Sequence, residues 1–152
     1  MSRPCSFDGK TDVVTGGTSG IGARTVWRFA EAGASVVALE AADPHAPVHP
    51  GICCVEFHVT DSEALTRRIR ALPRVDALAN DVGISRHADE YRMDQFERVL
   101  NVNLTSVMRA SDAALPALSV NGGSIVNLAS CSPGASFVTG AIVPVDGGYS
   151  TV

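Results

Sequence analysis

A glycine-rich stretch near the amino terminus has the spacing of a phosphate-binding turn. The run Thr15-Gly16-Gly17-Thr18-Ser19-Gly20-Ile21-Gly22 separates residues typical of a buried strand from residues with helical periodicity. At such a strand-to-helix turn, unpaired backbone N–H groups and the positive end of the helix can receive the pyrophosphate of a dinucleotide. Glycine is needed because a side chain would block the tight turn, the phosphates or the packing of helix on strand. Many such turns bind no nucleotide, so the interpretation depends on the residues that follow.

An acidic residue follows at the distance expected for the ribose contact of a dinucleotide site. Glu40 ends the second predicted strand, and its carboxylate can accept hydrogen bonds from the adenosine ribose hydroxyls. Ala41 and Ala42 offer no cation to a 2′-phosphate, and the carboxylate would repel one. These residues predict a preference for NAD over NADP. The alternative is that Glu40 is only a solvated charge at the end of a strand.

The residues around these motifs alternate between strand-like and helix-like patterns. Strands are predicted over residues 12–15, 35–40, 52–57, 75–79 and 124–128, and helices over 21–32, 61–71 and, as one or two helices, 93–118. The alternation predicts an α/β fold in which a doubly wound, mostly parallel, Rossmann-like sheet is covered by helices on both faces. One dinucleotide-binding domain is expected over residues 1–152. The alternation stops after the fifth strand, where a turn-like stretch leads to a short final strand over 141–145.

The composition argues against a nucleic-acid or membrane partner. The formal net charge is −4, and the dense basic cluster at 67–70 is interpreted as a solvated helix face. No apolar run approaches the roughly 20 residues that a membrane helix needs. The cysteines have no C-x-x-C spacing, so we expect reduced thiols, a cytoplasmic location and no metal site; they are Cys5, Cys53, Cys54 and Cys131.

Several segments, in the right order, resemble the short-chain dehydrogenase/reductase family. Gly16-x-x-x-Gly20-x-Gly22 has that family's glycine spacing, and residues 78–84 (Leu-Ala-Asn-Asp-Val-Gly-Ile) resemble its Asn-Asn-Ala-Gly loop. Asn101-Val102-Asn103-Leu104 resembles the segment with its active-site Asn, and residues 122–130 resemble its fifth strand, which ends in the catalytic Ser. Residues 137–140 and 145–149 resemble its C-terminal signature.

The resemblance implies an NAD(H)-dependent oxidoreductase that passes hydride between the nicotinamide C4 and an alcohol or carbonyl substrate. Asn103 would hold a water in the proton relay, and Ser130 would polarise the substrate oxygen. A full-length chain is expected to form a homo-oligomer. The expected cofactor-binding residues are Gly16, Thr18, Ser19, Gly20, Ile21, Gly22, Glu40, His58, Val59, Asn80, Val82 and Gly83.

Two small departures from the family pattern fall in the expected cofactor site. Asp81 and Val82 replace the usual Asn and Ala, and Val82 adds bulk where the cofactor packs. His58 stands where the family usually has an Asp that contacts the adenine amino group. NAD binding is still expected.

A third departure concerns the chemistry. The family uses a Tyr as general acid or base, with a Lys four residues later, but neither Tyr91 nor Tyr149 has such a partner and Lys10 is the only lysine. By resemblance, on the order of a hundred residues are missing between Ser130 and Cys131, far more than a trimmed loop. The literal 152-residue chain is therefore expected to be inactive.

Two hypotheses remain open from the sequence. The chain is an oxidoreductase if the missing segment exists in the molecule, and otherwise a catalytically inactive NAD-binding remnant or regulatory module. The retained glycine-rich loop argues against a purely structural role.

Overall fold

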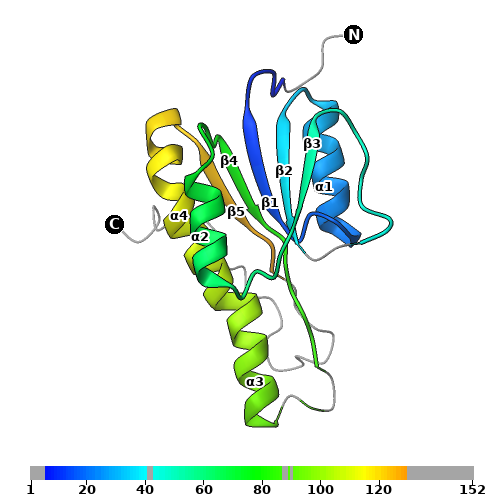
Figure 1. Cartoon of the computed structure of the whole chain (residues 1–152), viewed down its shortest axis with the longest axis vertical. Coiled ribbons are helices and arrows are strands. Elements are labelled where there is room, and N and C mark those ends of the chain that lie inside the picture. Colours follow the sequence, from blue (N-terminus) through cyan, green and yellow to red (C-terminus); the bar gives the residue numbers. More distant parts are fainter. Residues whose placement is uncertain (1–5, 41–42, 87–88, 90, 130–152) are drawn as a thin grey trace, which may run out of the picture.

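The computed structural model describes residues 6–40, 43–86, 89 and 91–129, which form a single sheet flanked by helices (Figure 1). The predicted final strand over 141–145 lies outside the described residues, as do Ser130 and Cys131. In chain order the elements are β1 (Thr11–Thr15), α1 (Gly20–Glu31), β2 (Ser35–Glu40), β3 (Ile52–Glu56), α2 (Ser62–Arg70), β4 (Ala77–Asn80), α3 (Met93–Leu100), η1 (Asn101–Thr105), α4 (Ser106–Asn121) and β5 (Ser124–Asn127).

The sheet is parallel and has the strand order β3-β2-β1-β4-β5. From β1 the chain adds β2 and β3 on one side, and then crosses over to add β4 and β5 on the other. The direction of winding therefore reverses between β1 and β4, the point at which open α/β sheets bind ligands beyond the carboxyl ends of their strands. The predicted doubly wound, Rossmann-like fold is confirmed.

Two apolar cores lie on the two faces of the sheet, because successive residues of a strand point in opposite directions. Val14 of β1 packs on one face with Val26 of α1 and Ala38 of β2. Val13 points to the other face, where it packs with Leu65 of α2 and with residues of α4. The helices on these faces are visible in Figure 1.

The α1 face is only partly covered within the described residues. Strand pairing places Val126 of β5 beside Ala79 of β4 on this face, yet Val126 is 57% exposed. The reason is topological: α1 is the crossover between β1 and β2, whereas α2 and α4 cross on the opposite face. The expectation of helices over both faces therefore holds at the centre of the sheet and not at β5.

The region predicted as one or two helices over 93–118 is one continuous helical run with a change of winding inside it. α3 leads into a π-helical turn, η1, and then into α4. Ser106 Oγ donates to the carbonyl oxygen of Val102 at 2.5 Å within this stretch. Gly122, with φ of 64°, ends α4 in the left-handed conformation that terminates many helices. Such π turns often occur at functional sites.

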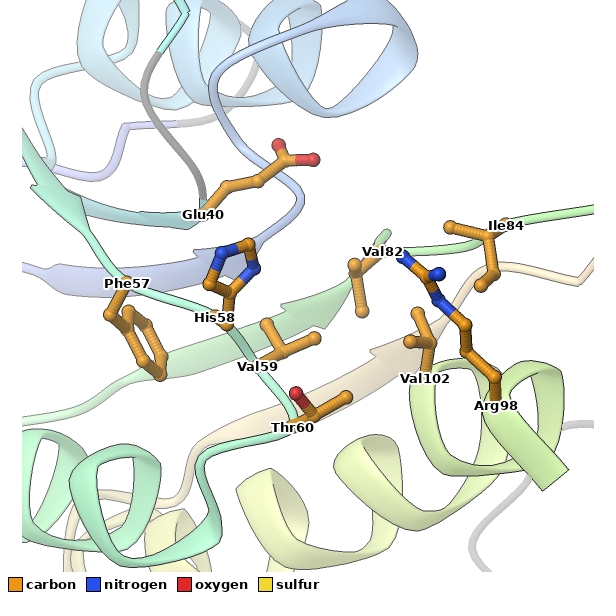
Figure 2. A pocket seen from close by; sticks show the side chains of 9 residues that line it. All are labelled: Glu40, Phe57, His58, Val59, Thr60, Val82, Ile84, Arg98 and Val102. Atoms are coloured by element: carbon orange, nitrogen blue, oxygen red, sulfur yellow. The ribbon is translucent and has the colours of Figure 1, made fainter. Parts of the chain in front are cut away.

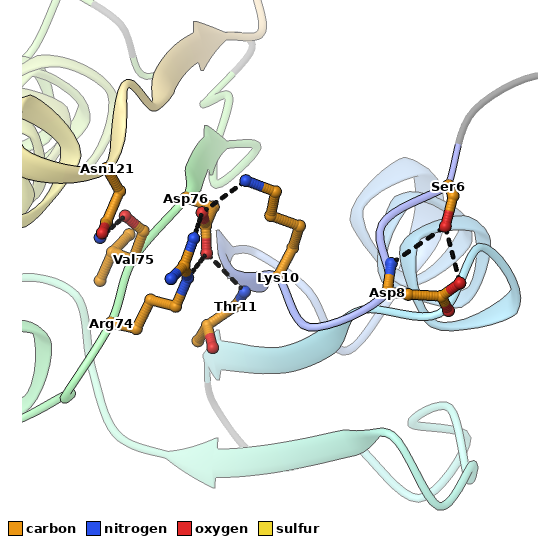
Figure 3. Close-up of polar contacts among 8 residues, drawn as sticks. All are labelled: Ser6, Asp8, Lys10, Thr11, Arg74, Val75, Asp76 and Asn121. Atoms are coloured by element: carbon orange, nitrogen blue, oxygen red, sulfur yellow. Dashed lines mark hydrogen bonds and ion pairs between the residues drawn. The ribbon is translucent and has the colours of Figure 1, made fainter.

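An ion cluster joins the amino ends of β1 and β4, as Figure 3 shows. The Asp76 carboxylate accepts hydrogen bonds from Lys10 Nζ at 3.0 Å, from the Thr11 backbone N–H at 2.9 Å, and from Arg74 Nη2 at 2.6 Å. The hydrogen bonds from the Arg74 side chain are the main reason why the pKa of Asp76 lies well below its usual range. The hydrogen bonds from the Thr11 N–H and from Lys10 lower it further. Lys10 thus lies at the end of the sheet opposite the expected cofactor site.

Candidate functional site

The glycine-rich loop lies between β1 and α1 and leaves no room for side chains at two of its positions. Gly16 has φ of 74°, and a Cβ there would lie 2.6 Å from the backbone nitrogen of Val82. A Cβ on Gly22 would collide with the carbonyl oxygen of Gly16. The loop therefore passes close to the segment after β4, and the first turn of α1 closes onto the loop. This is the cradle that a pyrophosphate at a helix N-terminus requires.

Glu40, at the carboxyl end of β2, is bonded to the same loop. Its Oε2 accepts hydrogen bonds from the backbone N–H of Thr18 at 3.3 Å and from Thr18 Oγ1 at 3.0 Å. The contact brings the predicted ribose acceptor to the edge of the predicted phosphate site. Sequence reasoning selected both residues and missed the bond between them, because their separation of 22 positions carries no local signal.

A pocket opens beside Glu40, beyond the carboxyl ends of β2, β3 and β4 (Figure 2). Four of the predicted cofactor residues line it, namely Glu40, His58, Val59 and Val82. The other lining residues were not predicted: Phe57, Thr60, Ile84, Arg98 and Val102. The last two lie four positions apart on the α3–η1 run, so helical spacing would have paired them once one was placed.

Asn80 lies beneath the site and only 2% of it is exposed. Its Nδ2 donates to Asn127 Oδ1 at 2.8 Å and to Ser111 Oγ at 3.4 Å, while its Oδ1 accepts from Thr15 Oγ1 at 3.4 Å. These bonds connect β4 to β1, β5 and α4. Asn80 thus supports the sheet under the site and does not line the pocket.

Asn103, in the π turn, grips the loop that follows β4. Its Nδ2 donates to the carbonyl oxygen of Ile84 and its Oδ1 accepts from the Ile84 N–H, both at 2.8 Å. Gly83 lies next to this pair, where a Cβ would stand 3.8 Å from Asn103 Oδ1. The amide of Asn103 is therefore engaged with the backbone. The second predicted catalytic residue, Ser130, is outside the described part of the chain.

Asp81 is half-buried between the glycine-rich loop and α1. Its backbone N–H donates to the Thr15 carbonyl oxygen at 3.0 Å. Burial raises the pKa of its carboxyl group, and a hydrogen bond with the Thr25 side chain opposes that rise. A carboxylate therefore stands where the family pattern has a neutral amide.

The described residues contain no group of three or more His, Cys, Asp or Glu side chains placed to hold a metal ion. Across the same ranges, no helix is both long enough and apolar enough to cross a bilayer.

The parallel sheet, with its glycine-rich loop at the switch point and helices on its faces, defines a protein of the α/β, Rossmann-like class. The chain belongs to the short-chain dehydrogenase/reductase family, since the short chain dehydrogenase family matches it over residues 10–142.

Named relatives agree with this assignment. The chain is 33% identical over 139 residues to a 3-oxoacyl-(acyl-carrier-protein) reductase of Thermotoga maritima, covering 82% of this chain and 56% of the relative. It is 34% identical over 138 residues to a meso-2,3-butanediol dehydrogenase of Serratia marcescens, covering 83% and 55%. The chain thus spans about half the length of the curated relatives it matches.

Solved structures share the fold. A short-chain dehydrogenase/reductase from Serratia marcescens has a TM-score of 0.67 at 30% identity, over 80% of this chain and 57% of that one. The ligand-free aldohexose dehydrogenase of Thermoplasma acidophilum has a TM-score of 0.71 at 27% identity, over 80% and 49%.

Proposed function

We propose that this chain is the cofactor-binding part of an NAD(H)-dependent oxidoreductase that acts on an alcohol or carbonyl group of a small molecule. The observation that carries the NAD assignment is the position of Glu40, bonded to Thr18 of the phosphate loop at the rim of the pocket. A carboxylate there can accept hydrogen bonds from ribose hydroxyls and repels a 2′-phosphate. The named relatives, which are reductases and dehydrogenases, support the reaction class.

In this proposal the bound cofactor supplies the hydride donor or acceptor, and the chain holds it. Gly16 and Gly22 leave space for the pyrophosphate, and the side chains of Val59 and Val82 flank the adenosine half. Asn103 positions the loop after β4 through its two bonds to Ile84. Ser130 is assigned to the substrate oxygen by family resemblance.

The NAD assignment is tested by calorimetric titration with NAD and NADP. NAD should bind more tightly than NADP to the unaltered chain. Glu40→Gln keeps acceptor oxygens but removes the charge, so the preference should fall by at least about tenfold. Glu56→Gln, which changes an exposed Glu at the end of the neighbouring strand, is the matched control and should leave it unchanged. Equal or tighter NADP binding by the unaltered chain would exclude the assignment of Glu40.

A second candidate is an NAD-binding module without turnover. It is favoured by one observation: the only lysine, Lys10, is bonded to Asp76 at the far end of the sheet. Both candidates predict NAD binding, and they differ only in whether hydride transfer follows.

A further inference from the structure

The pocket beside Glu40 has apolar walls that suit a planar base. Val59 lies just beyond β3, Val82 and Ile84 follow β4, and Val102 belongs to η1. The cavity measures about 260 Å³. Whole small-molecule sites measure about 300–1,000 Å³. The pocket therefore fits one half of a dinucleotide better than all of it, and its place next to the ribose acceptor makes that half the adenosine.

Arg98 brings a cation to this pocket. Figure 2 shows its guanidinium beside Val82 and Ile84, on the opposite side of the pocket from Glu40. The guanidinium of Arg98 forms no hydrogen bond or ion pair with any other residue that the structure describes. Asp94, one helical turn earlier, is bonded to other side chains. The guanidinium is thus available to a ligand.

The polar side chains around the base are rich in donors. A guanidinium can only donate hydrogen bonds, whereas the His58 ring and the Thr60 hydroxyl can donate or accept. Among the described residues that line the pocket, Glu40 is the only carboxylate, and Thr18 holds it on the ribose side. Of the lining side chains in the described ranges, none is therefore a dedicated acceptor for an exocyclic amino group at the Arg98 side.

Purine bases differ in what they offer to such a donor. Adenine presents the N7 acceptor beside an N6 amino donor, whereas a 6-oxopurine presents two adjacent acceptors, O6 and N7, which arginine binds in a bidentate manner. We infer that the pocket recognises its base through acceptor atoms paired with Arg98, and that it takes hypoxanthine at least as well as adenine. This inference rests on the proposed binding of NAD.

The test compares NAD with nicotinamide hypoxanthine dinucleotide by calorimetric titration of the full 152-residue chain. The unaltered chain should bind the hypoxanthine dinucleotide as tightly as NAD or more tightly. Arg98→Gln replaces a pure donor with an amide that both donates and accepts, and should shift the ratio of the two dissociation constants toward NAD by about tenfold.

Arg109→Gln is the control, because Arg109 is an exposed arginine on the same helical run outside the pocket. The ratio of the two dissociation constants in Arg109→Gln should match that in the unaltered chain. The ratio is taken within one protein sample, so a loss of folded protein does not change it. Tighter binding of NAD than of the hypoxanthine dinucleotide by the unaltered chain, or an unchanged ratio in Arg98→Gln, overturns the inference. Failure of the unaltered chain to bind either dinucleotide overturns the proposed function itself.

Discussion

Two neighbouring carboxylates, Asp12 and Asp76, differ in the hydrogen-bond donors around them. Asp76 accepts from Arg74, Thr11 and Lys10, which stabilise its charge. Asp12 is fully buried in β1, and neither of its carboxylate oxygens has a hydrogen-bond partner among the described residues. Burial and the nearby Asp76 carboxylate, opposed in part by Lys10, together raise the pKa of Asp12 to about 6. A charge at this position opposes folding.

The first prediction is that the Asp12 carboxylate lowers the free energy of unfolding at high pH. The Asp12 carboxyl group has a higher pKa in the folded chain than in the unfolded chain. Its contribution to the free energy of unfolding is therefore fully present below about pH 4, where the group is protonated in both states. That contribution is lost as the pH rises through about 6. Asp12→Asn should therefore raise the free energy of unfolding by about 1–3 kcal/mol at pH 8 and change it little at pH 4. Urea unfolding of both chains across this range measures the difference.

Asp112→Asn is the control for that experiment, since Asp112 is exposed and forms only a surface ion pair with Arg70. It should shift the free energy of unfolding by no more than about 1 kcal/mol at either pH. A destabilised Asp12→Asn chain at pH 8 would show that the Asp12 charge has a partner in solution.

Residue types and spacing were sufficient to select the glycine-rich loop, Glu40 and the second-strand boundary. Residue types and spacing could not select Arg98 as a pocket residue, and they could not predict the raised pKa of Asp12. Both depend on which side chains approach from other elements, and that is decided by packing between segments far apart in sequence.

At the scale of elements, the π turn η1 places two side chains at the pocket and at the loop after β4. Hydrophobic periodicity predicted a helical region over 93–118. Periodicity indicates which side of a helix is apolar, but not where α-helical hydrogen bonding changes to π-helical hydrogen bonding. η1 is the part that presents Val102 to the pocket and Asn103 to Ile84. The family resemblance drew attention to Asn103, and the structure adds what its side chain holds.

The loop after β4 should loosen when this contact is removed. Asn103→Ala deletes both hydrogen bonds to Ile84, so exchange of the Ile84 amide hydrogen should accelerate, by about tenfold for a loss of about 1.4 kcal/mol. NAD affinity should fall with it, because Val82 and Ile84 line the pocket. Hydrogen exchange and calorimetry measure the two effects. Asn101→Ala, an exposed change in the same turn, should alter neither; unchanged exchange in Asn103→Ala would contradict the prediction.

At the scale of the whole molecule, the described residues leave apolar side chains in solvent. The largest set lies along the outer side of α3, η1 and α4, and the face of β5 adds Val126 and Leu128. Exposed apolar areas of this kind commonly mark contacts with other chains or segments. Along the helical run the exposed large apolar residues are Met93, Phe96, Leu100, Leu104, Met108, Leu115 and Val120.

The assembly prediction follows from which helices the chain supplies. By family resemblance, subunits pair through the fifth-strand helix, here α4, together with the helix that carries the Tyr and Lys. A 152-residue chain without that second helix should not form the family's four-helix interface, even though its α4 exposes Met108 and Leu115. Sedimentation velocity on a chain of verified mass should show no stable tetramer. A tetramer that persists on dilution would exclude this expectation.

The last prediction concerns turnover by the same chain. Hydride transfer to a carbonyl needs a proton donor at the substrate oxygen, and a positioned general acid contributes a factor of about 10² to 10⁴ to such reactions. Tyr91 is fully exposed, and Lys10 is committed to Asp76 at the opposite end of the sheet, so these two residues cannot act as a pair. We therefore expect NAD binding without measurable NADH formation or consumption, whichever alcohol or carbonyl compound is offered. The measurement is NADH absorbance over time with a chain whose intact mass matches 152 residues, and calorimetry on the same sample confirms that the cofactor is bound. Turnover by that sample would mean that another group supplies the proton, and the residues around Asn103 would be the first place to look for it.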